Sequence, residues 1–331
     1  MQTVRWGMIG CGDVAEVKSG PALYKAEGST LVAVMRRDRA KADDYARRHN
    51  VPRVHAHVDD LIGDPDVDAV YIATPPSSHC ELALKAAAAG KPCLVEKPMA
   101  MNDAECRQMV DAFDAAQRPL WVAYYRRALP RFLKVRELLR ANVIGTLTSV
   151  HVKVTDPLAT GDAAKAWRFN TEIAGAGLFL DLASHYFDII DFLVGPITAA
   201  AGFPLNTGGS YEAEDVTATA FEIAGKVAGT GVWNFNAAAS GDSIVFTGSQ
   251  GEIATAVRAD EDVVVTRGGQ PNLYRFRNPP HVHQPLIQTI VDELRGRGKC
   301  ESTGESGART AWVAERCLER CYNEKRRTKS E

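Results

Sequence analysis

Polar side chains with acid–base chemistry interrupt an apolar stretch in the second half of the chain. Within residues 177–193, Asp181, His185 and Asp188 fall at positions i, i+4 and i+7, so they share one face of a predicted helix. An imidazole, with a pKa of about 6.5, can exchange a proton near neutral pH, and a carboxylate beside it can tune or orient it. The pattern predicts a helix that borders a cleft, and the alternative is a histidine satisfied within the core.

A second set of polar residues follows the apolar stretch 92–95, where Glu96, Lys97 and Pro98 come together. Proline cannot continue the hydrogen bonding of a strand, so a predicted strand ends here. Ligands of parallel sheets bind outside the carboxyl ends of the strands, and we therefore expect the Lys97 ammonium to point into a crevice. There it can polarise a carbonyl oxygen, or share in proton transfer if its pKa is depressed.

A glycine-rich turn, "GMIGCGDVA", lies between the first predicted strand and the first predicted helix. Gly10 permits a tight turn, Gly12 lets a pyrophosphate approach the backbone, and the small Ala15 allows close helix packing. Because strand, turn, helix and strand follow each other within the first 35 residues, the pattern favours a dinucleotide site over an unliganded turn. The residues expected to contact the dinucleotide here are Ile9, Gly10, Gly12, Asp13 and Val14.

The end of the second predicted strand indicates which dinucleotide binds. Sites of this kind carry an acidic residue there for the ribose hydroxyls, whereas this chain has Arg36 followed by Arg37. Arginine pairs well with a phosphate and poorly with a bare diol, so the sequence favours NADP, with NAD as the alternative cofactor. The competing interpretation is two solvated arginines at the start of a helix whose N-cap is Asp38.

The order of predicted elements defines the fold. Up to about residue 124, short apolar runs alternate with helical patterns, which predicts a doubly wound α/β Rossmann domain over residues 1–125. Strands then follow each other without intervening helices, which predicts an α+β domain over residues 126–331 with an open, mostly antiparallel sheet. The crevice between the domains is the expected ligand site. The residues expected around the cofactor at the carboxyl ends of later strands are Thr74, Pro75, Pro76, His79, Glu96 and Lys97.

Several motifs, in order, resemble the Gfo/Idh/MocA family of NAD(P)-dependent sugar and polyol dehydrogenases, which includes glucose-fructose oxidoreductase and inositol dehydrogenase. Besides the glycine turn they are "ATPPSSHCELALKAAAAGKPCLVEKP", "AYYRRALPRF", "WRF", "AGAGLFLDLASHYFDIIDFL" and "HVHQPLIQTIVDELRGRGKCESTGESGARTAWVAE". The resemblance covers essentially the whole chain. It implies that Lys97 lies beside the nicotinamide and the substrate hydroxyl, and that Asp181 and His185 match an aspartate and a histidine on the first long helix of the second domain.

The resemblance, with the residue chemistry, assigns roles. We expect His185 to transfer the proton, Lys97 to supply electrostatic stabilisation and take part in the relay, and Asp181 to orient substrate hydroxyls or the imidazole. Trp167 and Arg168 resemble a pair that reaches the nicotinamide half in NADP-using relatives, or they anchor a loop. Relatives commonly have asparagine or tyrosine near the cofactor where this chain has Tyr125. Tyr274 and His283 are weaker candidates for the substrate side.

The predicted function is hydride transfer between NADP(H) and a carbinol or carbonyl carbon of a sugar, polyol or related small molecule. The alternatives are an NAD(P) sensor without catalysis, a redox-neutral NAD-dependent glycosidase, and a reductase of an aromatic dihydrodiol or a tetrapyrrole. The joint presence of Lys97 and His185 favours an enzyme over a sensor. An open sheet tends to be buried against a partner, so we expect a homodimer or homotetramer.

The composition and charge of the chain argue against several other classes of protein. A formal net charge of -2 over 331 residues gives no basic field for nucleic acid or for an anionic membrane. The first residues lack the apolar core of a signal peptide, and the seven cysteines form no CxxC pair, so we expect a cytoplasmic protein without a disulfide framework. Cys317 with Cys321, and His281 with His283, do not form a four-ligand cluster at zinc spacing, and no metal is predicted.

Overall fold

The computed structural model describes residues 2–328, and side chains up to residue 320. The chain forms two compact units. The first comprises the residues up to Leu129 together with Asn278–Ala308, and the second comprises Pro130–Arg277 together with the residues from Arg309 on.

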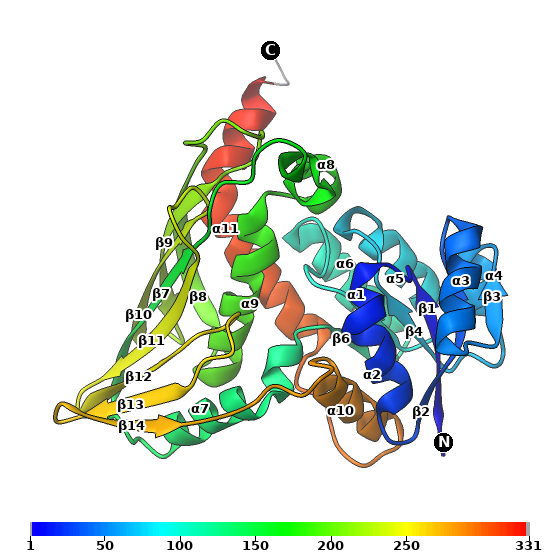
Figure 1. Ribbon diagram of the computed structural model, residues 1–331, viewed down its shortest axis with the longest axis horizontal. Helices are drawn as coiled ribbons and strands as arrows, with labels where there is room; N and C mark the ends of the chain where they lie inside the picture. The colour runs from blue at the N-terminus through cyan, green and yellow to red at the C-terminus, as the bar shows by residue number, and fades with distance from the viewer. Residues whose placement is uncertain (1, 329–331) are drawn as a thin grey trace. The chain divides into compact units, whose positions relative to one another are not determined.

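The first unit is built on a six-stranded parallel sheet with the order β3-β2-β1-β4-β5-β6 (Figure 1). The strand order reverses between β1 and β4, which is the switch point where doubly wound sheets bind ligands. The strands are β1 (Val4–Ile9), β2 (Ser29–Met35), β3 (Arg53–His55), β4 (Ala69–Ile72), β5 (Cys93–Val95) and β6 (Leu120–Val122). The helices are α1 (Asp13–Val17), α2 (Ser19–Lys25), α3 (Arg39–His49), α4 (Val58–Gly63), α5 (His79–Ala88), α6 (Asp103–Ala115) and α10 (Gln284–Leu294), with short 3₁₀ turns η1 (Pro76–Ser78) and η2 (Tyr125–Ala128). The predicted Rossmann fold is confirmed.

Helix α10 closes one face of this sheet although it comes late in the sequence. Its apolar residues Leu286, Ile287 and Ile290 are buried in one core cluster with Leu94 of β5 and Trp121 of β6. Both faces of a parallel sheet with crossover helices must be covered by other elements. Helix α10, from late in the sequence, supplies part of that cover. The expected boundaries, 1–125 and 126–331, therefore differ from the observed units, because 278–308 packs with the first unit.

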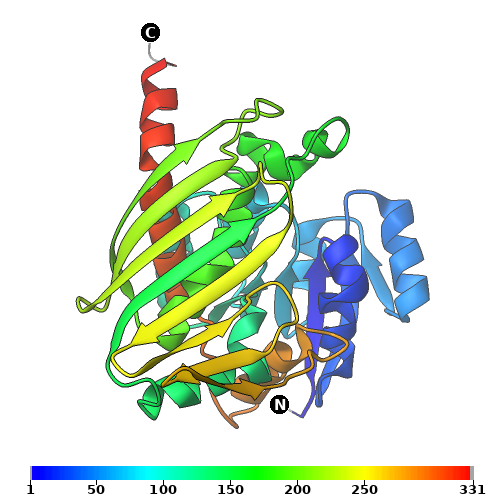
Figure 2. The ribbon, with the colours of Figure 1, turned by 60° about the vertical axis from the view of Figure 1, so that its left-hand side comes forward.

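The second unit is built on an eight-stranded sheet with the order β14-β13-β12-β11-β7-β10-β9-β8 (Figure 2). Only the β7–β10 pair in this order is parallel, so the expected mostly antiparallel sheet is confirmed. The strands are β7 (Leu147–Thr155), β8 (Ile197–Leu205), β9 (Val216–Ile223), β10 (Val227–Asn234), β11 (Gly241–Gly248), β12 (Gly251–Thr255), β13 (Val263–Arg267) and β14 (Gln270–Tyr274). The helical elements are α7 (Pro130–Arg140), η3 (Ala163–Lys165), η4 (Trp167–Phe169), α8 (Thr171–Ala174) and α9 (Leu178–Leu193), and α11 (Gly304–Thr328) continues into this unit.

Helix α9 forms the centre of the second unit. Its side chains Phe179 and Phe187 pack edge-on or tilted against Trp233 of β10, with ring centroids 5.1 and 5.4 Å away. The segment Thr171–Leu193 has the length and hydropathy of a membrane span, but 78% of its most apolar window is buried inside the protein. A buried apolar helix is what the core of a folded domain requires.

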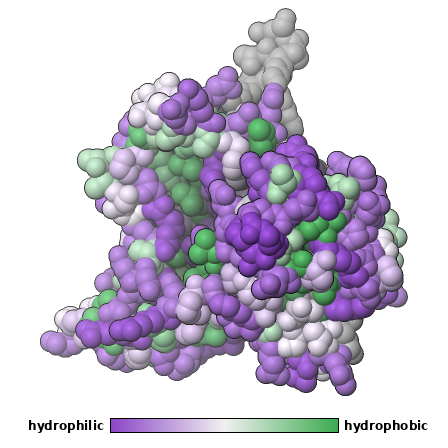
Figure 3. Space-filling view, turned by 45° about the vertical axis from the view of Figure 1, so that its right-hand side comes forward, coloured by the Kyte–Doolittle hydropathy of each residue, from purple (hydrophilic) through white to green (hydrophobic). Residues whose placement is uncertain are grey.

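The sequence patterns missed β3, α4, β8, β12 and β14. Strand β8 contains Gly202 and Pro204, which weaken a strand pattern, yet it pairs with β9 along its length at the edge of the sheet. At the surface, hydrophilic side chains cover most of the face drawn in Figure 3.

Candidate active site

The carboxyl ends of β1, β4, β5 and β6 lie side by side in the first unit. Ile9 of β1 pairs with Ile72 of β4, Ile72 with Val95 of β5, and Val95 with Val122 of β6. The segments that follow are the glycine turn, the Thr74 loop, the Glu96–Pro98 loop and the tyrosines at 124 and 125. The structure therefore brings together, at one edge of one sheet, the segments that the sequence predicted to surround a cofactor.

The glycine turn has the shape that a pyrophosphate needs. Gly10 has a φ of +95°, and a Cβ added there would lie 2.7 Å from the carbonyl oxygen of Ala73, so only glycine fits. A Cβ added at Gly12 would meet nothing within 4 Å. The space above Gly12 is thus open toward the start of α1 at Asp13, where a dinucleotide phosphate would lie. These residues fit the cofactor that the fold implies.

Arg36, at the end of β2, lies against this turn. Its Nη1 donates to the carbonyl oxygen of Cys11 across 2.8 Å, while Arg37 is exposed. The helix-start interpretation also has a structural basis, because the Asp38 carboxylate accepts from the backbone N–H of Lys41 at 3.2 Å. That hydrogen bond lowers the pKa of Asp38. The two interpretations do not exclude each other, because Asp38 caps α3 while the Arg36 side chain lies against the glycine turn.

His79 lies inside the unit. Its side chain is buried, with Nε2 2.7 Å from the carbonyl oxygen of Thr74 and Nδ1 3.0 Å from that of Pro98. Burial lowers the pKa of this imidazole. The ring thus contacts backbone of two loops at the sheet edge, whereas Pro75 and Thr74 are partly exposed and Pro76 is buried.

Glu96 and Lys97, adjacent in the chain, differ in environment. Glu96 is buried and accepts a hydrogen bond of 2.5 Å from the Tyr71 hydroxyl and one of 3.2 Å from the Lys97 backbone N–H. Burial raises the pKa of its carboxyl group. Lys97 is half-buried, and its peptide bond to Pro98 is cis. Glu96 therefore supports the loop from inside, and Lys97 is the member of the pair with access to the surface.

His283, a weak candidate from the sequence, joins this group from the late segment. Its ring stacks on Tyr125 with centroids 4.5 Å apart, and its Nδ1 lies 3.8 Å from Oε1 of Glu96. Burial, with the positive charges of Lys18, Arg126 and Lys97, lowers the pKa of His283 to about 3. Tyr274, the other weak candidate, lies on β14 in the second unit.

In the second unit, α9 carries the predicted acid–base pair. Asp181 lies in its first turn and is half-buried, whereas His185 and Asp188 are buried. Arg168 Nε lies 3.5 Å from Oδ2 of Asp181, and the same guanidinium lies over the Trp167 ring, 4.6 Å from its centroid. The structure thus brings Trp167, Arg168 and Asp181 together.

Two further residues near the start of α9 were not found from the sequence. Glu214 accepts from the backbone N–H of Gly177 at 3.0 Å and holds the beginning of the helix. Tyr211 packs on Phe169, with ring centroids 4.3 Å apart, and burial raises its pKa to about 12. Both lie in a connection between strands, where no periodic pattern marks them.

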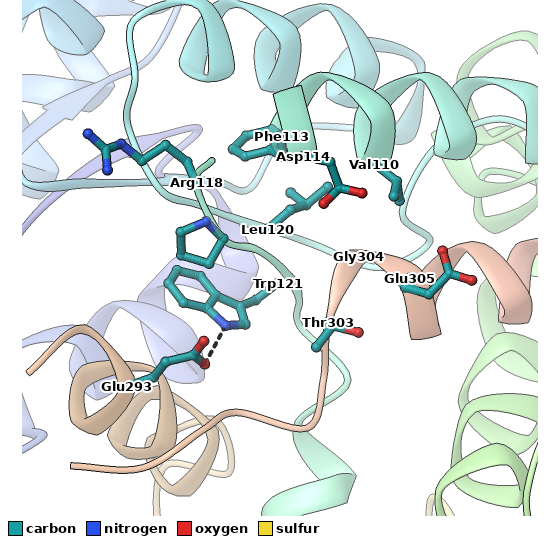
Figure 4. A pocket seen from close by; sticks show the side chains of 11 residues that line it. Val110, Phe113, Asp114, Arg118, Leu120, Trp121, Glu293, Thr303, Gly304 and Glu305 are labelled. Carbon is teal, nitrogen blue, oxygen red and sulfur yellow. Dashed lines mark hydrogen bonds between the residues drawn. The ribbon is translucent and has the colours of Figure 1, made fainter. Parts of the chain in front are cut away.

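The first unit also has a recess of about 250 Å³, which lies apart from the candidate active site (Figure 4). It lies beside Pro119 and Leu120 at the amino end of β6, and Trp121 Nε1 there donates to Glu293 Oε2 at 3.0 Å. Ligands of doubly wound sheets bind at the opposite, carboxyl end, so this recess is not the candidate active site. Among the residues that the structure describes, no group of three or more His, Cys, Asp or Glu could hold a metal ion. The side chain of Cys321 lies outside the described part.

A doubly wound sheet with an open glycine turn at its switch point, followed by an α+β unit, is typical of two-domain dinucleotide-binding oxidoreductases. Residues 4–124 match the family model "Oxidoreductase family, NAD-binding Rossmann fold", and residues 132–254 match the "GFO/IDH/MocA C-terminal domain". The chain belongs to the Gfo/Idh/MocA family, and the resemblance found in the sequence is confirmed. It is therefore an enzyme, an NAD(P)-dependent dehydrogenase or reductase.

Individual relatives support this assignment. The chain is 40% identical over 292 residues to Oxidoreductase P35 of Formosa agariphila, which covers 87% of this chain and 90% of that protein. It is 26% identical over 308 residues to 1,5-anhydro-D-fructose reductase of Ensifer adhaerens, covering 92% of each. In fold it is similar to levoglucosan dehydrogenase in complex with NADH and levoglucosan, with a TM-score of 0.86, 21% identity and 98% of both chains covered.

Proposed function

We propose that this protein transfers a hydride between NADP(H) and a carbinol or carbonyl carbon of a sugar, a polyol or a related small molecule. The observation that carries the proposal is the alignment of Ile9, Ile72 and Val95 at the carboxyl ends of their strands, which puts Gly12 and Lys97 on loops at one edge. That edge offers an open turn for a pyrophosphate and an ammonium for the reacting oxygen. Relatives named 1,5-anhydro-D-fructose reductase and inositol 2-dehydrogenase support the substrate class.

When bound, the nicotinamide accepts or supplies the hydride. The hydroxyl proton must then leave as the carbinol is oxidised, or arrive as the carbonyl is reduced, and we assign this transfer to His185. Lys97 donates to the substrate oxygen and stabilises the negative charge that develops there. Asp181 orients substrate hydroxyls or the imidazole, and its carboxylate lies 3.5 Å from Nε of Arg168. The mechanism requires Lys97 and His185 to act on one substrate molecule.

The preference for NADP over NAD rests on Arg36. Its guanidinium lies next to the glycine turn and has donors besides the one used by Cys11, so it can pair with a ribose phosphate. The other proposed cofactor contacts come from Ile9, Asp13, Val14 and Arg37 around the turn, and from Thr74, Pro75, Tyr125, Trp167 and Arg168. For His79, Glu96 and Pro76, which are buried, we propose that they shape the cofactor loops from inside.

A substrate panel tests the proposal. The purified protein is incubated with NADPH or NADP and with ketoses, aldoses, inositols and dihydrodiols, while the nicotinamide absorbance is followed. We expect turnover with a polyhydroxylated substrate. Cofactor binding without turnover of any substrate would favour a sensor, and cleavage of glycosides without release of reduced cofactor would favour a redox-neutral glycosidase. Turnover restricted to dihydrodiols or tetrapyrroles would favour the non-sugar reductase.

We also propose that two or four copies associate through the sheet of the second unit. In Figures 1 and 2, α9 and α11 lie on one face of this sheet. The other face carries exposed side chains such as His151 and Thr230, which are hydrogen-bonded across β7 and β10. The exposed apolar side chains on strands of this sheet are Phe203, Leu205, Val232 and Leu273. Such a surface favours burial against a second copy, and a monomeric mass by light scattering would contradict it.

A cytoplasmic location is proposed from the cysteines. The free thiols in the described part are Cys11, Cys80, Cys93, Cys106, Cys300 and Cys317. Proteins of oxidising compartments tend to pair their cysteines. Fractionation of the native host cell tests this proposal, and recovery from an oxidising compartment would contradict it.

A further inference from the structure

His79 is a buried titratable side chain to which the proposed mechanism gives no chemical step. It is the first residue of α5 and has no exposed surface. Its Nε2 lies 2.7 Å from the carbonyl oxygen of Thr74, in the loop after β4, and its Nδ1 lies 3.0 Å from that of Pro98, in the loop after β5. One rigid ring thus spans two loops that meet at the candidate active site.

These loops have few backbone donors of their own. Pro75, Pro76 and Pro98 have no N–H, so the segments cannot extend the strand ladder. The last ladder hydrogen bonds donated by residues just after β4 and β5 are Ala73 N–H to Ile9 and Glu96 N–H to Ile72, at 2.8 and 2.9 Å. Within the first loop the Ser78 N–H also donates to the Pro75 carbonyl at 3.1 Å, and side chains supply further contacts. Ser78 Oγ donates to the Pro75 carbonyl at 2.9 Å within the first loop, and His79 connects the first loop to the second.

We infer that His79 is a positioning residue for Lys97. Pro98 directly follows Lys97 in the chain, so a side chain that holds the Pro98 carbonyl restricts the backbone from which the ammonium extends. A neutral ring donates to one of the two carbonyls and an imidazolium donates to both. In either form the five-membered ring sets the distance between the loops. The inference rests on the proposed role of Lys97.

Three substitutions separate the two contacts. In His79→Asn the amide nitrogen takes the place of Nδ1 and keeps a donor for Pro98, whereas in His79→Gln it takes the place of Nε2 and keeps a donor for Thr74. His79→Leu removes both ring nitrogens, and with them both contacts. His57→Asn is the matched control, because His57 is exposed and lies in the same unit.

Two measurements are made on each variant. The first is kcat with KM for the substrate, and the second is the rate at which an amine-reactive reagent labels Lys97 in the cofactor-free protein, followed by mass spectrometry against exposed Lys41. We expect His79→Leu to lower kcat by about a hundredfold, as for a catalytic group displaced by about 1 Å, and to change Lys97 labelling at least about threefold. His79→Asn should recover most of both losses, and His79→Gln should not.

The outcomes are distinct. Unchanged Lys97 labelling in folded His79→Leu, or equal behaviour of His79→Asn and His79→Gln, would overturn the inference. If His79→Leu does not fold, the comparison of His79→Asn with His79→Gln tests the inference by itself. If the wild-type protein turns over no substrate, the proposed function fails, while the labelling of Lys97 still tests the role of His79.

Discussion

Arg36 donates from Nη1 to the carbonyl oxygen of Cys11 across 2.8 Å, which joins the end of β2 to the glycine turn after β1. The contact uses one of the five N–H donors of the guanidinium. Arg36 is therefore oriented by the protein before any cofactor binds. A pre-oriented arginine loses less conformational entropy when it pairs with a phosphate.

Replacing Arg36 by alanine is expected to weaken NADPH binding selectively. A hydrogen bond to a charged group is worth about 1.5–3 kcal/mol, so the Kd for NADPH should rise roughly tenfold to a hundredfold, with little change for NADH. Calorimetric titration with both cofactors measures this. Arg39→Ala is the control, because Arg39 pairs with Asp43 on the exposed side of α3. An equal loss for NADH would show that Arg36 acts through the turn and not through a phosphate.

The two glycines of the turn should respond differently to alanine. Gly12→Ala places a methyl group in open space, so the unfolding midpoint should stay near that of the wild type while the dinucleotide Kd rises at least about tenfold. Gly10→Ala forces a side chain into a left-handed backbone and against Ala73, and it should lower stability by about 1 kcal/mol or more. Thermal unfolding and cofactor titration of both variants check this. Normal affinity in Gly12→Ala would place the pyrophosphate elsewhere.

Substitutions at the proposed catalytic pair should strongly reduce turnover. Lys97→Met and His185→Ala are each expected to lower kcat by roughly a hundredfold or more, since each removes a group that acts on the reacting oxygen. Steady-state kinetics with the best substrate of the panel measures the effect. Lys85→Met, at a partly exposed site paired with Asp59, serves as the control. Near-normal turnover in either variant would contradict the assigned mechanism.

His283 should make the protein sensitive to mild acid. Its folded pKa of about 3 lies below the unfolded value of about 6.5, so the unfolded chain binds a proton that the folded chain excludes. Stability from this residue is present above pH 6.5 and is lost as the pH falls toward 3, by at most about 1.4 kcal/mol per pH unit. Urea unfolding of wild type and His283→Gln at pH 7.5 and pH 5 measures the difference. If both proteins lose stability equally, His283 is not the group that titrates.

Local sequence patterns determined the secondary structure around much of the candidate site. The strand, turn and helix around Gly10 and Gly12, and the helix that carries Asp181 and His185, follow from residue type and spacing over fewer than about twenty positions. Short-range sterics and amphipathic periodicity decide such elements wherever they lie in a fold. The family resemblance predicts more than any single pattern, because it rests on several of these patterns in a fixed order along the chain.

Tertiary structure alone decided which distant segments share a core. Nothing near residue 283 indicates that its imidazole stacks on Tyr125 beside Glu96, or that α10 covers the sheet of the first unit. The order of elements had suggested instead that everything after residue 125 belongs to the second domain. Which segments pack together depends on the shape and the apolar area of the surface that the rest of the folded chain leaves exposed. No short stretch of sequence contains that information.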